Sequence, residues 1–401
     1  MCNLKWELKK FPLNIWLFFL ILLVMLLLNY FVATKKIQRN TAAITDDFQR
    51  GLDDVYSVVE GPITLEKMNW IISEHNRLSD IIQDGQFSTE KDEENTYTGY
   101  VFSDNALFEQ VYQEAKYSFE YGTEAQRIAS TAKENAEYYQ NRSSKKLATY
   151  YLAMANAFQS RNIPGFYRTD GWMSYFEYEF SNLMVLLTIM IGLSTIFSLE
   201  WEFGTKSIIR VISGGTQKSR RDKLLFALLF VFLITTLFSI QDYLIFAGHY
   251  NFSGLNNPLY AVPEMRETPL NISLGVFILV NFFVKLFGMC AFAVHLLLVS
   301  AVVKCNLYAF SGSVICLMLH ILLNAVESNL SVLPLFNCAH LCSKFEGFAL
   351  GGFFVLRIFS RACIQFIIGC CCLLLLCVLD RDQTPYKGKD NRHDSAYQMA
   401  T

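Results

Sequence analysis

Long apolar runs alternate with polar segments along this chain, and their lengths predict helices that cross a membrane. The first run, residues 13–33, has roughly the 20 residues that a bilayer-spanning helix needs. It is too long for the apolar core of a signal peptide and lacks a small-residue cleavage site, so we expect it to remain as the first span. Later runs lie at about 181–198, 224–247, 273–303, 309–325 and up to residue 379. The pattern therefore predicts an all-α membrane protein with six transmembrane helices.

A long polar segment, residues 35–178, separates the first two apolar runs. Apolar residues recur at three- and four-residue spacing from 65 to 82, and further helical stretches are expected at about 106–132 and 144–159. No run in this segment is long enough to cross a membrane. We therefore predict a large, mostly helical insertion. Its frequent aromatic residues favour packing in a core over a ligand-binding surface.

The start of the sixth span is open in the sequence. Arg357 and Arg361 would be costly in lipid, so either the span begins near Ala362 or the two arginines face protein or water. The preceding loop, residues 327–352, is too long for a tight turn. The short apolar pieces within it and at its end, including 345–354, favour a re-entrant or interfacial element.

Lysine and arginine are concentrated on one side of the predicted membrane. With six spans, the segments 1–11, 198–223 and 381–401 and Lys304 share one side. Together they hold 14 basic residues, whereas the short loops of the other side hold only Arg266 and Lys344. The positive-inside rule then predicts a multi-pass protein of the cell membrane with cytoplasmic termini and an extracytoplasmic insertion. The expected domains are 1–34 (cytoplasmic N-terminus and first helix), 35–178 (extracytoplasmic helical domain), 179–380 (helices two to six) and 381–401 (cytoplasmic tail).

Composition agrees with a membrane protein and excludes some other classes. The chain is 53% hydrophobic and 17% charged, with a net charge of −2, whereas soluble domains are about a quarter charged. Because no basic cluster marks a folded face, no nucleic-acid partner is expected.

Among eleven cysteines, Cys338 and Cys342 are spaced for a possible disulfide. These two are too few ligands for a metal site even with His340 between them, so we expect no metal.

The chain lacks the motif of a nucleotide-driven motor. A phosphate-binding loop needs the pattern G-x-x-x-x-G-K-[ST], because glycine amides must surround the phosphates. Segments 204–207 and 214–219 are superficially similar, but in neither does glycine directly precede lysine. Hydrolase motifs are also absent. We therefore expect no enzymatic activity and no cofactor in this chain.

Polar residues within the apolar runs are candidates for a translocation path. Lys285 is the strongest candidate for ion coupling, since ionisable groups at membrane depth are costly and usually functional. His295, His320 and Asn281 lie on the same or the next predicted span. The sequence offers Lys285 no acidic partner in the middle of another span.

The charged segment 198–223 is wedged between two apolar runs. Residues 206–212 predict a short amphipathic helix, which the glycines after it would end. Such a helix between two spans suits docking in a groove of a partner protein. An ordinary basic cytoplasmic loop is the equally weighted alternative.

This segment resembles the connection between the second and third spans of type-2 ABC transporter permeases. The matching residues are Glu200, Gly204-Thr205, the apolar stretch 208–212, Ser219-Arg220-Arg221 and Lys223. The insertion after the first span and the segment 60–64 are similar to a branch of that family from Gram-positive gut bacteria. The family's re-entrant outer helices between the last two spans would correspond to residues 328–354. Residues 211–215 depart from the family, which often has a Leu-Leu run with Pro or Ser there.

The resemblance implies a permease subunit of an ATP-driven exporter of a peptide, lipid or hydrophobic compound. Its coupling helix would contact a separate cytoplasmic ABC ATPase, which binds ATP and Mg, and a second permease subunit would complete the pathway. The alternatives are a membrane-anchored peptide sensor or immunity protein, and an ion-coupled carrier using Lys285. The residues implied in coupling are Glu200, Glu202, Gly204, Thr205, Ile208, Arg220 and Arg221.

Overall fold

The protein was analysed as a computed structural model. The structure describes residues 15–41, 45–85, 96–212, 215–250, 252–325, 336–350 and 352–381. The expected N-terminal segment 1–11, part of the loop before the last span and nearly all of the tail lie outside these residues.

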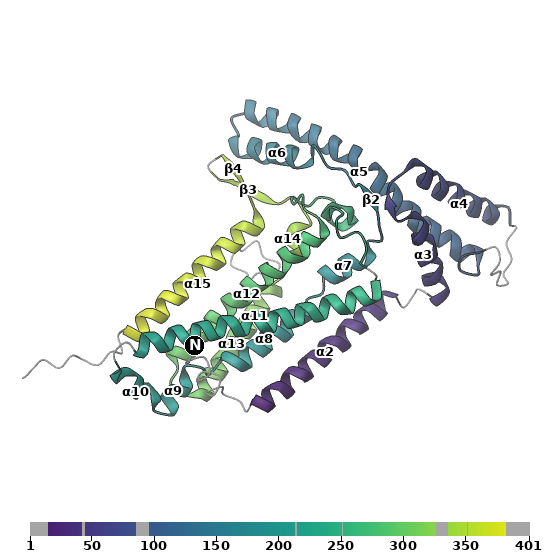
Figure 1. The fold of residues 1–401 in the computed structure, drawn as a ribbon. Helices are drawn as coiled ribbons and strands as arrows, with labels where there is room; N and C mark the ends of the chain where they lie inside the picture. The colour runs from purple at the N-terminus through teal and green to yellow at the C-terminus, as the bar shows by residue number, and fades with distance from the viewer. Residues whose placement is uncertain are drawn as a thin grey trace, which may run out of the picture.

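Apolar helices run side by side and form a bundle (Figure 1). The members are α2 (Ile15–Thr41), α8 (Phe180–Leu193), α11 (Gly215–Tyr250), α12 (Leu274–Val302), α13 (Asn306–Ala325) and α15 (Arg357–Arg381). Within the described residues, five segments are long and apolar enough to cross a membrane, namely Ile15–Thr41, Asp170–Glu202, Gly215–Tyr250, Leu274–Val302 and Arg357–Val378. The apolar part of α13, Asn306–Leu322, is shorter. These lengths are consistent with an all-α membrane protein. The number of six transmembrane helices remains a prediction.

Helix α8 lies in the middle of the bundle core. Its residues Val185, Ile189 and Leu193 are fully buried among side chains of α11, α12 and α13. Gly192 allows Phe230 of α11 to approach, because a Cβ at this position would lie 2.5 Å from the ring. By contrast, α2 and α15 expose most of their large apolar side chains. An exposed apolar face of this size is suited to lipid or to another membrane helix.

Four helices beyond one end of the bundle form what we call the helical domain (Figure 1). They are α3 (Asp46–Val59), α4 (Leu65–Gln83), α5 (Val101–Asn141) and α6 (Lys145–Phe158). The hydroxyls of Thr45 and Thr64 accept hydrogen bonds from the first turns of α3 and α4, which is how threonine caps a helix. A core that includes Val55 and Phe108 joins α3, α4 and α5. All three helical stretches expected in this segment are present.

Short connections fasten the helical domain to the bundle. Strand β1 (Gly61–Pro62) pairs with β2 (Gly165–Phe166), just before α7 (Asp170–Phe176) leads into α8. The chain between α11 and α12 forms two short 3-10 helices, η1 (Leu259–Ala261) and η2 (Pro263–Met265). Tyr260 and Ala261 of η1 pack against side chains of α5 and α6.

Arg161 connects the helical domain to the loop between α11 and α12, and we call this contact region the junction. The guanidinium is buried, lies 4.0 Å from the ring centroid of Phe158 and donates a 2.6 Å hydrogen bond to the carbonyl of Thr268. Tyr121 donates a second hydrogen bond across the junction, to the carbonyl of Arg266. The loop after α11 is therefore tied to the helical domain through its backbone.

The segment before α15 differs from the expected re-entrant helices. Its described part contains the four-residue helix α14 (Ala339–Cys342) and a hairpin of β3 (Gly347–Leu350) and β4 (Phe353–Leu356). The hairpin reaches α6, where Phe345 and Phe354 stack and both rings contact Tyr150. Alternating exposure along β3 fits a strand with one packed face.

Helix α15 begins at Arg357 and not near Ala362. Arg357 forms an ion pair with Glu346 just before β3. Of the two alternatives, the structure therefore favours the one in which this arginine faces protein. The pairing also explains how a helix that is long and apolar enough to span a bilayer can start with a cation.

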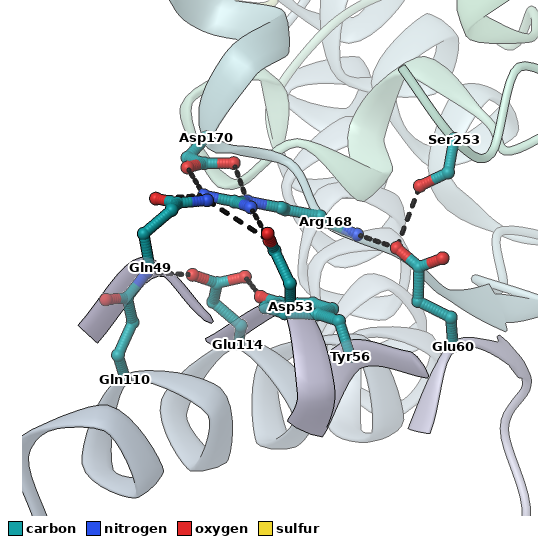
Figure 2. A network of polar contacts seen from close by, with 9 residues as sticks. All are labelled: Gln49, Asp53, Tyr56, Glu60, Gln110, Glu114, Arg168, Asp170 and Ser253. Atoms are coloured by element: carbon teal, nitrogen blue, oxygen red, sulfur yellow. Dashed lines mark hydrogen bonds and ion pairs between the residues drawn. The ribbon is translucent and has the colours of Figure 1, made fainter. Parts of the chain in front are cut away.

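A polar network centred on Arg168 joins the helical domain to the start of α7 (Figure 2). Its guanidinium lies 2.9 Å from carboxylate oxygens of both Asp170 and Asp53. Its backbone N–H donates to Glu60, which also accepts from the hydroxyl of Ser253 after α11. One arginine thus connects α3, α7 and, through Glu60, the loop between α11 and α12.

Beside this network, Tyr56 donates a 2.6 Å hydrogen bond to the half-buried carboxylate of Glu114 (Figure 2). Gln110, one turn earlier on α5, donates to the other oxygen. Burial raises the pKa of Glu114, and the hydrogen bonds from Tyr56 and Gln110 partly offset that rise.

We expect Glu114→Gln to gain stability relative to the wild type as the pH rises from about 4.5 to 8. A carboxyl whose folded pKa is raised contributes stability that is fully present below the pKa of the unfolded state and is lost as the pH rises through the folded pKa. Glutamine stays neutral and does not lose it. Hydrogen exchange of α5 amides in the purified chain at several pH values measures the difference. Glu120→Gln, at an exposed position of α5, is the control, and a pH-independent difference for Glu114→Gln would contradict the prediction.

Candidate functional site

Two short helices lie at the end of the bundle away from the helical domain (Figure 1). They are α9 (Ser198–Glu202) and α10 (Thr205–Val211), and Gly204 joins them with a φ of +69°. This left-handed conformation favours glycine, although no neighbouring atom would crowd a side chain there. The amphipathic helix expected at 206–212 is present. Residues 216–223 form the first turns of α11, which begins at Gly215, so the basic residues of this segment lie on the same helix as the apolar run that follows.

A buried ion pair connects α9 to α11. The carboxylate of Glu200 lies 2.9 Å from the ammonium of Lys223, and the two side chains are 3% and 0% exposed. Lys223 also lies 4.2 Å from the ring centroid of Phe197, and Ser219 donates a hydrogen bond to Glu200. The resemblance implied that Glu200 takes part in coupling to a partner. The structure turns its carboxylate inward, where it holds two elements together.

Further hydrogen bonds fix α9 to the turn between α12 and α13. Ser300 accepts from the backbone N–H groups of Phe197 and Ser198, and the hydroxyl of Ser198 donates to Asn306. The exposed carboxylate of Glu202 accepts from the backbone N–H of Asn306 at the start of α13, where a negative charge is favourable. Helix α9 is thus attached to α11, α12 and α13 at once.

The outer side of these helices is apolar and exposed. We call this region the α9–α10 surface, and its large exposed side chains are Phe203, Ile208, Val211 and Ile212. The cations of Arg210 and Lys304 lie 4.6 and 5.0 Å from the ring centroid of Trp201.

The remaining residues that the resemblance implied in coupling have different positions. Gly204 and Arg221 are exposed beside the α9–α10 surface. The hydroxyl of Thr205 donates back to the carbonyl of Glu200, so it stabilises the turn. Arg220 donates to the carbonyl of Cys377 on α15, which gives it a contact within the chain.

A buried polar cluster lies deeper in the bundle, near the start of α8. Asn29 of α2 donates to Asp242 at 2.9 Å and to Gln241 at 3.0 Å, both on α11. Tyr178 donates to the side-chain oxygen of Asn29 at 2.9 Å. Buried polar groups are costly unless they are hydrogen-bonded, and these groups satisfy one another.

Lys285 of α12 completes the cluster. Its ammonium lies 3.7 Å from Asp242 and donates a 3.0 Å hydrogen bond to Ser181 of α8. The expectation that Lys285 lacks an acidic partner is wrong. Asp242 is eight residues before the end of α11, and Lys285 is eleven residues after the start of the antiparallel α12. At 1.5 Å per residue these distances are about 12 and 16 Å, so helix lengths alone could have indicated that the two groups lie at similar depth.

The other predicted translocation residues do not join Lys285 in one site. Asn281 accepts a hydrogen bond from the backbone N–H of Cys338 and lines a cavity of about 40 Å³ beside Lys285 and Asp242, which is room for a few water molecules. His295 is ten residues, or about 15 Å, further along α12. It forms a 3.1 Å hydrogen bond with His320 of α13.

Cys338 and Cys342 are free, buried thiols at the two ends of one helical turn. The predicted disulfide between them is therefore not formed in the structure. Within the described part of the chain, no group of three or more His, Cys, Asp or Glu side chains could hold a metal ion.

Comparisons of this chain with protein-family models, with curated proteins and with solved structures found no match. The function is therefore inferred from the two arrangements above, the α9–α10 surface and the buried polar cluster.

Proposed function

We propose that this chain is the membrane-spanning subunit of an ATP-driven transporter of the type-2 ABC class. A separate ATPase subunit, which binds ATP and Mg, would dock on the α9–α10 surface. The proposal places both termini and this surface in the cytoplasm and the helical domain outside. A second permease subunit would pack beside this chain, and the cargo would be a peptide, a lipid or another hydrophobic compound.

The observation that carries the proposal is a group of exposed apolar side chains on α10 and the turn before it, next to helix α9, which is fixed to the bundle. Val211 is 86% exposed and extends the apolar face of α10 past Ile208. Water-exposed apolar patches of this kind mark interaction sites in folded proteins. The basic residues that flank the patch keep it out of the membrane core, which favours a protein partner over lipid.

The attachment of α9 supplies a route for the ATPase to act on the spans. Helix α10 packs against α9 and the start of α11. The Glu200–Lys223 pair and the hydrogen bonds at Ser300 and Asn306 link α9 to three apolar helices. A displacement of the α9–α10 surface would therefore tilt those three helices together, because α9 is bonded to all of them and would move with them as one rigid body.

We expect Val211→Asp to weaken association with the ATPase by tenfold or more, since a charge in a buried apolar contact costs roughly 1.4 kcal/mol or more. The assay measures ATPase binding to the purified chain in lipid nanodiscs, with an ABC ATPase from the same organism as the partner. Val58→Asp is the matched control, because Val58 is 59% exposed on α3 of the helical domain. Equal binding by the two variants would refute docking at this surface.

An ion-coupled carrier is the second candidate function. The observation that favours it is the Asp242–Lys285 pair next to a cavity within the bundle. Paired ionisable groups at membrane depth often mark ion pathways. Substitutions that remove both charges of the pair separate this function from a purely structural role.

A further inference from the structure

A cleft between α2 and the start of α8 has the chemistry of a phospholipid site. It encloses about 660 Å³, within the range of small-molecule sites, and its walls come from the last turns of α2 and from residues 177–180. Phe31, Val32 and Phe180 form its apolar part. Its polar part consists of Lys35, Lys36, Arg39, Asn40, Glu177 and Glu179.

The polar part lies at the level where a bilayer meets water. The apolar run of α2 ends at Ala33, and the helix continues for two turns with Lys35, Lys36 and Arg39. Phe31, Lys35 and Arg39 are four residues apart and therefore follow one face of the helix. Along this face the apolar ring of Phe31 is followed by the cations of Lys35 and Arg39. A phospholipid at the membrane boundary has the matching order, with its acyl chain on the membrane side and its phosphate on the water side.

The charges of the cleft are unequally satisfied within the protein. Lys36 donates a hydrogen bond to the carbonyl of Ser174. Each lysine also lies 5.8 Å from an aromatic ring, Lys35 from Phe31 and Lys36 from Tyr178. Within the described residues, Lys35 and Arg39 form no ion pair, and both are exposed. Two cations that face the cleft without a carboxylate partner are suited to bind a phosphate group.

The opposite wall adds a preference among headgroups. Glu177 and Glu179 line the same cleft as the cations of α2. Both carboxylates interact electrostatically with Lys36, and Glu179 also accepts a hydrogen bond from Asn337. Carboxylates repel a headgroup that is only anionic and attract one that also carries an ammonium group. Phosphatidylethanolamine has both charges, whereas phosphatidylglycerol has the phosphate alone.

We propose that this cleft binds a bilayer phospholipid with an amine-bearing headgroup. Lys35 and Arg39 hold its phosphate, Glu177 and Glu179 hold its ammonium, and Phe31 with Phe180 contacts its acyl chains. The site lies at the opposite end of the bundle from the α9–α10 surface, so it does not depend on an ATPase partner.

The test compares lipid binding by the purified full-length chain in detergent, measured by native mass spectrometry and by the lipid-induced rise in Tm. We expect phosphatidylethanolamine to bind and raise Tm more than phosphatidylglycerol does, and inorganic phosphate to leave Tm unchanged. The double variant Lys35→Ala/Arg39→Ala should bind phosphatidylethanolamine roughly tenfold more weakly. Its Tm without lipid should match that of the wild type, since both side chains are exposed.

Two further variants complete the test. Arg127→Ala/Lys133→Ala removes two exposed cations from α5 and should bind lipid like the wild type. Glu177→Gln/Glu179→Gln should lose the preference for phosphatidylethanolamine over phosphatidylglycerol. Wild-type lipid binding by Lys35→Ala/Arg39→Ala would overturn the site. An equal effect of inorganic phosphate would overturn the lipid as its ligand, and a preference unchanged in the glutamine variant would overturn the assigned headgroup.

Discussion

Replacing Glu200 with alanine is expected to lower the free energy of unfolding by about 3–5 kcal/mol, because it removes one partner of a buried ion pair. The carboxylate lies 2.9 Å from the ammonium of Lys223, and that ammonium is inaccessible to water. Without Glu200 the charge of Lys223 stays desolvated while its nearest counter-charge is gone. Unfolding of the purified chain in mixed micelles, followed by tryptophan fluorescence, measures the loss.

Glu202→Ala is the matched control, since Glu202 is exposed and only two residues away on α9. Its hydrogen bond from the backbone of Asn306 is also exposed to solvent. An exposed charge contributes about 1 kcal/mol or less, so this variant should remain close to the wild type. The double variant Glu200→Leu/Lys223→Met should recover most of the lost stability, because an apolar pair of similar volume often replaces a buried ion pair without cost. A Glu200→Ala variant as stable as Glu202→Ala would show that the pair does not hold α9 to α11.

The same variants determine how loss of ATPase binding should be interpreted. If Glu200 acts through the position of α9, Glu200→Ala weakens ATPase association and Glu200→Leu/Lys223→Met restores it. If Glu200 contacts the ATPase directly, the double variant stays defective although it is stable. Val211→Asp, at an exposed position, should weaken association without a loss of stability.

Much of the secondary structure follows from local patterns in the sequence. Apolar runs long enough to span a bilayer correspond to α2, α11 and α12, and helical spacing predicted α4–α6. The end of α15 near residue 379 was predicted, but its start was left open. These features repeat within a few turns, so a window of about 20 residues contains the whole signal. The short helix α10 was also predictable, because its isoleucines recur at helical spacing and charged residues flank it.

The contacts that define the candidate site connect residues far apart in the chain. The sequence singled out both Glu200 and Lys223 as part of the charged loop. The spacing of the charges does not reveal, however, that Glu200 is buried while Glu202 faces solvent. The pairing of Lys285 with Asp242 depends on how α11 and α12 are aligned. The hairpin of β3 and β4 is stabilised by packing on Tyr150, about 200 residues earlier. These features depend on contacts between residues far apart in the sequence, and such contacts cannot be predicted from the local spacing of apolar residues.

Lys285→Met is expected to lower the free energy of unfolding by about 3 kcal/mol, the lower end of the range for breaking a buried ion pair. The lower end applies because the ammonium and the Asp242 carboxylate are 3.7 Å apart, and Asn29 still donates to that carboxylate. The double variant Lys285→Met/Asp242→Asn removes both charges and keeps an oxygen to accept from Asn29, so it should regain most of the loss. Denaturation in mixed micelles measures all three proteins, with Lys133→Met, at an exposed position of α5, as the control.

Transport by the double variant then distinguishes the two candidate functions. An ATP-driven permease uses the pair to align α11 with α12, so the double variant should transport its cargo in proteoliposomes with the ATPase and ATP at a rate near that of the wild type. An ion-coupled carrier needs a titratable or charged group at this depth, because its driving force is the movement of an ion through the site. Such a carrier would lose transport in the double variant even though the fold is restored. Stability regained together with transport therefore supports the ATP-driven permease, and stability regained without transport supports the carrier.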